Sequence, residues 1–353
     1  MITINSITKG FDRELTKKIM ATSSHIRIRP INSKGFPDWK NALTFFQSQK
    51  YLNGISPRFE CDTIIDGNSF TTGLRVIGII PKYEKTISPF LRKFNRKFKE
   101  KNWIIIGDEL FKETKLQLGD TVTLRGFENS MNFVIEGTFS VGLYDYDYSF
   151  AYISLENSNK LYEYPNIATS LNINIKNLDD LNKIVNSIHK KIPDLNIKTW
   201  RELNNSVVKT MKLEEIVIKL IIFLTSSLSL IGVVLLLFVN IEKRKNIIGI
   251  LFVNGLQKKS IKMIFFIEGV IISSLGIMGG VLSGLFLSYS ISTLTIKLPN
   301  EINETYGSNF IPVNIIPEDI IFIIATTFLL SILITWIITI KISSIKIINL
   351  LKN

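Results

Sequence analysis

The side chains best suited to catalysis are few in this sequence, and their spacing gives them little chemistry. The two histidines, His25 and His189, lie far apart and lack the spacing of metal ligands. Cys61 is the one cysteine, which excludes an intrachain disulfide framework and a cysteine-rich metal site. The sequence contains no G-x-x-x-x-G-K-S/T phosphate loop, no H-E-x-x-H and no G-x-S-x-G. We therefore expect a protein that is not an enzyme and has no catalytic residue, cofactor or metal of its own.

A second candidate for chemistry is a segment in which Asp145 and Asp147 alternate with three tyrosines, Tyr144, Tyr146 and Tyr148. Carboxylates two positions apart point to the same face of a strand, where they could hold a cation. A tyrosine-rich loop with a structural role is the alternative, and it is the interpretation we prefer.

The composition indicates which elements must position these residues. The 353 residues are 46% hydrophobic with a mean hydropathy of +0.25, which is too apolar for an ordinary soluble protein, and the excess lies after residue 215. The net charge is +12; the first 215 residues hold 31 Lys/Arg and 24 Asp/Glu, or +7, and the remainder holds +5. In the apolar part the basic residues cluster at loop ends, which argues against nucleic-acid binding and for membrane insertion.

Three long runs have the length of membrane-spanning helices. They are the uncharged runs Leu220–Ile241 and Gly269–Ile296, the second within a span at 264–296, and Ile320–Ile340. Gly276, Gly280 and Gly284 lie in the second span, where small residues let helices approach closely, so helix packing is their expected role.

The segment Glu242–Lys262 between the first two spans holds six Lys/Arg and one acid, with apolar residues between its basic ends. We interpret it as an amphipathic helix in a cytoplasmic loop, by the positive-inside rule. The basic tail after Lys341 is cytoplasmic by the same rule, and Lys297–Asp319, with one basic residue and four acids, faces outside. The first 215 residues are then extracytoplasmic. Glu268, at the edge of a span, is expected to reach the interface.

Alternating and helical patterns in the first 200 residues predict an α+β domain. The expected strands are His25–Arg29, Phe59–Ile65, Ser69–Ile80, Trp103–Ile106, Thr121–Arg125, Phe133–Phe139 and Phe150–Ile153, and the expected helices are Gly10–Ser24, Asp108–Lys115, Asp179–Lys191 and Arg201–Lys219. The predicted organisation is an exit from a membrane span at 1–25, an extracytoplasmic domain at 26–200, a connecting helix at 201–219 and a membrane domain at 220–353, with the cytoplasmic loop at 242–262.

Several segments together resemble the transmembrane subunits of lipoprotein-releasing ABC transporters, the LolC/LolE type within the MacB/FtsX-like permeases. The similar segments cover nearly the whole chain and are Gly10–Phe11, Ser24–Ile26, Ile106–Leu110, Leu118–Asp120, Gly137–Asp147, Thr199–Glu202, Asn240–Lys243, Ile247–Leu251 with Gly255, and Ile311–Val313. Gly137–Asp147 is the most specific match, and within it Gly142, Tyr144, Asp145 and Asp147 are the family-motif residues. The resemblance implies an α-helical membrane protein with a MacB-like periplasmic α+β core domain and an FtsX-like permease domain.

The resemblance also implies partners and a role. A separate cytoplasmic ABC ATPase (LolD-like) would bind ATP and Mg and grip the loop through Glu242, Lys243, Ile247, Ile248, Leu251, Phe252 and Gly255. Together with a second permease copy or paralogue, the chain would sit in the bacterial inner membrane, with the large domain periplasmic and the C-terminus cytoplasmic. It would extract lipoproteins from the outer leaflet of that membrane for a periplasmic carrier (LolA-like).

Two departures from the family pattern matter. By the resemblance, the chain begins within the last residues of the family's first span. Three spans are visible, and we expect that a fourth, N-terminal one has been lost through truncation, a misplaced start or a split gene. The connection Gly126–Asn132 is shorter than the carrier-recruiting hook of LolC-type members, so direct carrier docking is not expected. The alternatives are a permease of another MacB/FtsX-like system, for efflux or for control of cell-wall hydrolases, and a membrane-anchored binding module without transport.

Overall fold

The chain forms two compact units in a computed structural model that describes residues 1–67, 70–93, 98–127, 129–299 and 308–342. The sheet unit comprises Arg13–Val208 and Leu298–Asn309. The helical unit comprises Met1–Asp12, Lys209–Lys297 and Phe310–Asn353. The limits of the sheet unit are therefore wider than the 26–200 proposed for the extracytoplasmic domain.

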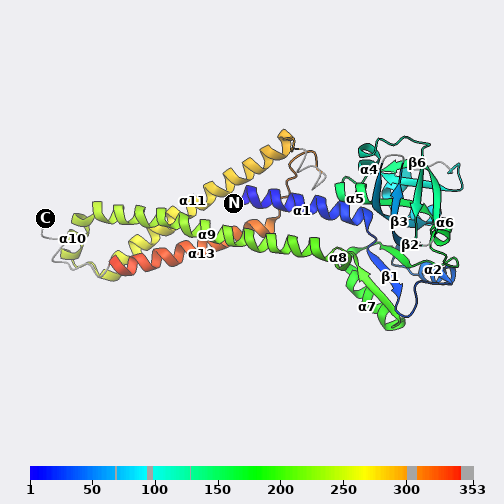
Figure 1. Cartoon of the computed structure of the whole chain (residues 1–353). Coiled ribbons are helices and arrows are strands. Elements are labelled where there is room, and N and C mark those ends of the chain that lie inside the picture. The colour runs from blue at the N-terminus through cyan, green and yellow to red at the C-terminus, as the bar shows by residue number, and fades with distance from the viewer. Residues whose placement is uncertain (68–69, 94–97, 128, 300–307, 343–353) are drawn as a thin grey trace. The chain divides into compact units, whose positions relative to one another are not determined.

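Nine strands in the described part of the sheet unit form one sheet (Figure 1). They are β1 Ile26–Pro30, β2 Leu52–Asp66, β3 Thr71–Ile79, β4 Trp103–Gly107, β5 Thr121–Arg125, β6 Ser130–Phe139, β7 Phe150–Ser154, β8 Ser170–Ile175 and β9 Leu195–Thr199. Each of the predicted strands is present, so the α+β class is confirmed, whereas β8 and β9 lack a matching prediction.

The 15-residue strand β2 organises the sheet because it pairs with three neighbours. Its first half pairs with β8, where Arg58 lies opposite Ser170, and its last residues pair with β5, where Ile65 lies opposite Leu124. It also pairs with β3, so the pairings β2–β3–β7–β4–β6–β5–β2 close into a ring of strands. Outside the ring, β8, β1 and β9 continue from β2 as an antiparallel extension.

Strand β4 is a continuous apolar run because both of its faces are buried. All five of its residues are buried, so neither face is left for polar side chains. Ile104 and Ile106 belong to one core cluster with Leu124, and Trp103 and Ile105 belong to another. The ring is thus held by apolar packing on both of its faces.

Short helices cover the sheet. They are α2 Trp39–Gln47, α3 Pro81–Glu84, α4 Asp108–Glu113, α5 Tyr144–Ser149, α6 Leu155–Leu161, α7 Leu181–Lys191 and α8 Trp200–Leu203, with 3-10 turns at Pro89–Lys93 and Leu178–Asp180. The helix predicted at Asp179–Lys191 is confirmed as α7, which buries Leu181, Ile184 and Ile188.

The connecting helix predicted at Arg201–Lys219 is confirmed from Asn205 onward, where α9 (Asn205–Lys243) continues into the first long apolar run, but it is interrupted at Asn204 after α8 ends at Leu203. The amide of Asn204 donates to the Trp200 carbonyl at 2.8 Å, a bond that competes with continued helix. At its start α8 has a capping box, in which Thr199 and Glu202 satisfy each other's backbone N–H groups.

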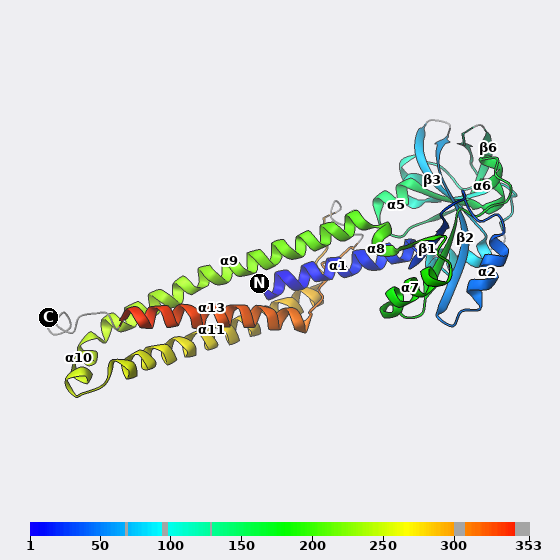
Figure 2. The same cartoon turned by 90° about the horizontal axis from the view of Figure 1, so that it is seen from below.

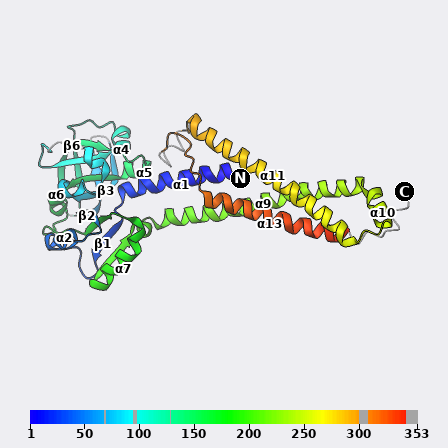
Figure 3. The same ribbon diagram turned by 180° about the vertical axis from the view of Figure 1, so that it is seen from behind.

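The helical unit contains α9 from Lys209 on, α10 (Lys245–Val253), α11 (Lys258–Leu294), α13 (Pro317–Ile342) and the first half of α1 (Ile2–Thr22), as Figures 2 and 3 show from two further sides. Three of its helices, α9, α11 and α13, are long and apolar enough to cross a membrane. Ser226 of α9 and Thr327 of α13 join two of them by a hydroxyl–hydroxyl bond of 3.2 Å.

Candidate functional site

Helix α10 presents an apolar face to the surroundings of the helical unit. Ile247, Ile250 and Val253 are 57%, 61% and 72% exposed and stand at i, i+3 and i+6, on one side of the helix. Such exposure is costly in water, because each of these side chains could stabilise the protein by about 1.5–3 kcal/mol if it were buried. The face therefore has the properties of a surface that a partner covers.

The opposite face of α10 is already occupied. Ile248 is buried in a cluster with Ile241, Ile261 and Phe265, which come from the ends of α9 and α11. Ile248 holds α10 onto the helical unit, so its expected contact with a partner is corrected. Leu251 is half-buried, and the side chain of Phe252 lies outside the described residues.

Gly255 terminates α10 with a left-handed turn. Its φ is +86°, a conformation that glycine adopts at little cost. The N–H of Leu256 donates to the carbonyl of Leu251 at 3.0 Å, which is the six-to-one bond of a Schellman motif. Leu256 then packs on the Ile248 cluster, so the turn fixes α10 relative to the start of α11.

Basic residues flank α10 on both sides. Lys258 and Lys259 are exposed in the first turn of α11, and Lys262 follows one turn later. Positive charge at a helix N-terminus opposes the helix dipole, so these lysines weaken the helix that carries them. Glu242 and Lys243 are exposed at the end of α9, and Arg244 is the single residue between α9 and α10.

The motif Gly142–Asp147 of the sheet unit forms a turn and a short helix, so the strand considered for Asp145 and Asp147 is wrong. Asp147 is buried at the heart of this turn, where its carboxylate accepts from Ser140 Oγ at 2.7 Å, Val141 N at 2.9 Å and Gly142 N at 3.0 Å. Asp145 is exposed, so the two carboxylates do not converge on a cation. No group of three metal-ligating side chains occurs among the described residues.

Burial raises the pKa of Asp147, although the Ser140 hydroxyl and the two backbone N–H groups act in the opposite direction. Gly142 has a φ of +78°, and the ammonium of Lys18 donates to its carbonyl at 3.1 Å, which ties the turn to α1. Tyr144 donates to Glu113 of α4, which raises its pKa to about 12. Asp147 thus stabilises this turn, which is a structural role of the kind that we preferred for the motif.

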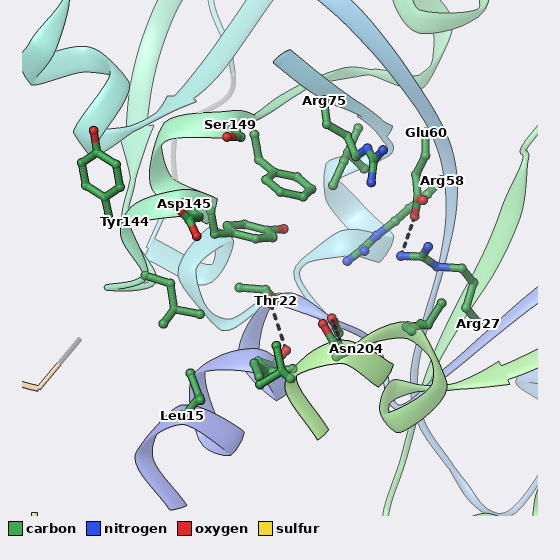
Figure 4. A pocket seen from close by; sticks show the side chains of 18 residues that line it. Leu15, Thr22, Arg27, Arg58, Glu60, Arg75, Tyr144, Asp145, Ser149 and Asn204 are labelled. Carbon is green, nitrogen blue, oxygen red and sulfur yellow. Dashed lines mark hydrogen bonds and ion pairs between the residues drawn. The ribbon is translucent and has the colours of Figure 1, made fainter. Parts of the chain in front are cut away.

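The motif Gly142–Asp147 borders a cavity of about 700 Å³ in the sheet unit (Figure 4). Leu15, Tyr144 and Asp145 lie toward one end in that view, and Arg27, Arg58, Glu60 and Arg75 lie toward the other. The sequence reading missed this cavity, because the arginines lie on separate strands and only the sheet pairing brings them together.

Comparisons with known proteins bear first on the helical unit. Residues 219–347 match the family described as FtsX-like permease C-terminal. These residues form an FtsX-like permease domain. The match includes α10, its basic flanks and the three long apolar helices.

The rest of the chain has relatives as well. It is similar to the lipoprotein-releasing system transmembrane protein LolC of Xylella fastidiosa strain Temecula1, at 21% identity over 92% of this chain and 79% of the relative. It is also similar to LolC of Buchnera aphidicola, at 27% identity over 95% of this chain and 85% of the relative. The periplasmic region of MacB from Actinobacillus actinomycetemcomitans is similar at 15% identity and a TM-score of 0.35, over 54% of this chain and 94% of that one.

FtsX-like permeases are membrane subunits of ABC transporters, which work with a cytoplasmic ATPase. The permease domain and the similarity to LolC proteins thus confirm the resemblance seen in the sequence and support a membrane subunit of an ABC transporter.

Within the permease domain, Glu268 links two helix ends in a way that the sequence did not reveal. Its Oε1 accepts from the Asn240 amide of α9 at 3.0 Å and lies 3.8 Å from the Arg244 guanidinium. Its Oε2 is buried and has no hydrogen-bond partner among the described residues. Glu268 therefore contacts the end of α9 within the permease domain, and its expected position at the membrane interface stays a prediction.

The glycines of the permease domain divide into two groups. A Cβ on Gly269 would meet Thr335 Cγ2 of α13 at 2.4 Å, so α11 and α13 touch there. A Cβ on Gly284 would meet Ile2 of α1 at 3.0 Å. A Cβ on Gly276, Gly279 or Gly280, by contrast, would meet no described atom within 4 Å apart from the neighbouring residues and backbone of its own helix, so no other described helix packs against these three glycines.

Proposed function

We propose that this permease extracts lipoproteins from the outer leaflet of the bacterial inner membrane for delivery to the outer membrane. The observation that carries the proposal is similarity to LolC proteins over 92–95% of the chain, which includes the sheet unit as well as the permease domain. A second copy of the chain or a paralogue completes the membrane part, and the Gly276–Gly280 surface of α11 is open to it.

The ATPase partner binds α10 from the cytoplasm and supplies ATP and Mg. Ile247, Ile250 and Val253 enter a groove of the ATPase, and the lysines at the start of α11 meet acidic residues on its rim. The Ile248 cluster passes movement of α10 to the ends of α9 and α11, because these three elements share one packed core.

The sheet unit is periplasmic in this proposal, and the C-terminus is cytoplasmic. The lipoprotein passes outward from the membrane as the ATPase closes on ATP, without a covalent step on this chain. The connection between β5 and β6, residues 126–129, is short and leaves carrier recruitment to the other permease subunit.

A co-purification experiment tests the ATPase contact. An Ile247→Asp/Ile250→Asp double variant should lose association with a P-loop ATPase by about tenfold or more, because two carboxylates would be desolvated at the contact. The matched control is Ile31→Asp/Leu118→Asp, which places the same charges on exposed apolar residues of the sheet unit. Equal loss in both variants, or retention of the ATPase by the α10 variant, contradicts the proposed contact.

A depletion experiment tests the substrate. When the chain is depleted in its host, lipoproteins destined for the outer membrane should accumulate in the inner-membrane fraction, measured by [³H]palmitate labelling and density fractionation. Unchanged lipoprotein sorting with altered drug tolerance or altered cell-wall cleavage would assign the permease to the efflux or hydrolase-regulating alternatives instead.

A further inference from the structure

The cavity of the sheet unit borders a charged surface that none of the roles above uses. A smaller cavity of about 170 Å³ shares Arg27 and Leu203 with the large one. Its remaining lining comes from β1 and β9, through Arg29, Asn196 and Lys198. The two cavities are therefore neighbours on either side of Arg27 and Leu203, and the smaller one lies at a basic edge of the sheet.

The charges at the basic edge destabilise the pairing of β1 with β9. Arg27 of β1 and Lys198 of β9 are directly opposite in register, and Arg29 follows Arg27 on the same face. Like charges in opposing positions destabilise a strand pair. One carboxylate, Glu60, contacts both arginines, at 3.0 Å from Arg27 and 2.9 Å from Arg29, and burial lowers the pKa of Arg27. The edge thus has three cations to one carboxylate and keeps a net positive charge that can attract an anion.

The other two arginines of this end are held in place by partners of their own. Arg58 is buried and pairs with Glu84, and Arg75 grips Asp62 with two nitrogens at 2.6 and 3.0 Å. Together with the basic edge, this end of the cavity has five cations and three carboxylates. The excess of positive charge lies at Arg27 and Lys198, where an incoming anion would meet it.

The apolar end is a different environment. Leu15, Ile19 and Leu143 line it, with Phe150 and Val207 further along the wall. Several polar groups of the cavity are already bonded within the protein, since Thr22 donates to the Ile19 carbonyl, Asn204 donates to the Trp200 carbonyl, and Tyr146 bonds Tyr152, whereas Asp145 is exposed. A peptide backbone placed along Leu15, Ile19 and Leu143 would lose hydrogen bonds to water that these side chains cannot replace, whereas a hydrocarbon chain has no such bonds to lose.

We propose that this cavity binds a single-chain amphiphile with an anionic head. The head accepts hydrogen bonds from Arg27 and Lys198, and the chain lies along the wall formed by Leu15, Ile19 and Leu143. The volume of about 700 Å³ falls within the usual range of ligand pockets, roughly 300–1,000 Å³. The site is separate from the ATPase contact and does not depend on the lipoprotein role.

Photolabelling of the full chain in phosphatidylcholine nanodiscs tests the site. The probe is palmitic acid with a diazirine on its chain and a terminal alkyne, and the labelled peptides are mapped by mass spectrometry. Label is expected on the α1 peptide around Leu15–Ile19 and the turn around Leu143, and unlabelled palmitate should remove it. Competition by palmitoyl lysophosphatidylglycerol at lower concentration would assign the source to lysophospholipids, and competition by palmitate alone would assign it to free fatty acids.

Variants separate recognition of the head from capture of the chain. Arg27→Gln/Lys198→Gln should lower labelling of these peptides about tenfold, the value expected when charge-assisted bonds to a carboxylate are lost. Leu143→Asn should lower it through the chamber wall, and Lys190→Gln, on the exposed face of α7, is the control that should leave it unchanged. Circular dichroism and the tryptic pattern establish that each variant is folded.

Three outcomes overturn the proposal. One is equal labelling of these peptides by the matching palmityl alcohol probe, which has no anionic head. Another is label confined to α9, α11 and α13 in folded protein. The third is displacement of the probe by an acidic, apolar peptide at lower concentration than palmitate, which would make the site a peptide-binding site.

Discussion

The two units keep their apolar residues in opposite places. In the sheet unit, β4 is buried along its whole length, and the ring of strands has apolar clusters on both faces. In the helical unit, only 6% of the most apolar stretch of α11 is buried within the described chain, and 22% of the most apolar stretch of α9 is buried. The sheet unit therefore covers its own hydrophobic surface, whereas the helical unit leaves that to lipid and to other subunits.

This difference indicates where partners can act. A unit that is apolar inside gains stability from its own core and offers few sites for a partner beyond its cavity. The helical unit has an exposed apolar face on α10 and three glycines on α11, Gly276, Gly279 and Gly280, where an added Cβ would meet open space within the described chain. Its stability depends on what surrounds it, so substitutions there should report on assembly, and substitutions in the sheet unit should report on folding.

The largest effect is expected from the buried ion pair of the sheet unit. Arg58 and Glu84 are 1% and 0% exposed, and Glu84 also accepts from Ser88. Burial alone would raise the pKa of Glu84, but the Arg58 guanidinium together with the hydroxyls of Ser88 and Ser56 lowers that pKa overall. Arg58→Met leaves a buried carboxylate without its partner and should cost about 3–5 kcal/mol of unfolding free energy. The loss is measured by heating the full chain and using limited proteolysis to monitor unfolding of the sheet unit.

Arg75→Met is the matched control for that variant. Arg75 and Asp62 form a pair whose side chains are 51% and 73% exposed, so its removal should cost no more than about 1 kcal/mol. If the two variants unfold at the same temperature, the buried ion pair contributes no more to stability than the exposed one. The view that the sheet unit depends on its buried interior would then be wrong.

Much of the sheet unit could be predicted from local patterns. The hairpin strands β2 and β3 and the amphipathic helix α7 follow from alternation, turn residues and helical spacing. Other features come from tertiary contacts. The segment at Asp145 alternates like a strand, yet Asp147 satisfies three donors of the preceding turn and holds the segment as a helix.

The candidate sites were predicted only in part, for a related reason. Hydropathy and charge identify α10 and its basic flanks, but they do not tell which face of α10 is free. Ile248 packs inward because the ends of α9 and α11 approach it, and Gly269 matters because Thr335, far away in the chain, lies against it.

A glycine pair tests the second half of the comparison. Gly269→Val forces a side chain against Thr335 and should destabilise the helical unit by about 1–3 kcal/mol through overpacking. Gly276→Val meets open space and should leave the melting temperature of the single chain in detergent nearly unchanged. In membranes, the second variant should instead weaken association with another permease subunit, measured by crosslinking. Equal melting temperatures for the two variants would show that α11 does not approach α13 at Gly269.

The smallest effect concerns pH, where the two units should again behave in opposite ways. In the helical unit, burial raises the pKa of Asp12 from its ordinary 3.8 to about 6, with help from Glu214 and Glu215 and against Lys9. Because the folded pKa lies above the unfolded one, stability is greatest below pH 4 and falls as the pH rises through 6. With allowance for solvent screening, Asp12 should cost about 1 kcal/mol at pH 7.5.

Asp12→Asn should therefore raise the melting temperature of the helical unit at pH 7.5 and have little effect at pH 4, and Asp179→Asn, in the exposed turn before α7, controls for the loss of one carboxylate. Glu84 has the opposite sign, because its lowered pKa gives stability that is present above the unfolded pKa and is lost as the pH falls through the folded one. Acid should thus weaken the sheet unit while it strengthens the helical unit. If Asp12→Asn destabilises the protein at pH 7.5, Asp12 is ionised and well paired there, and the two units do not differ in the sign of their pH dependence.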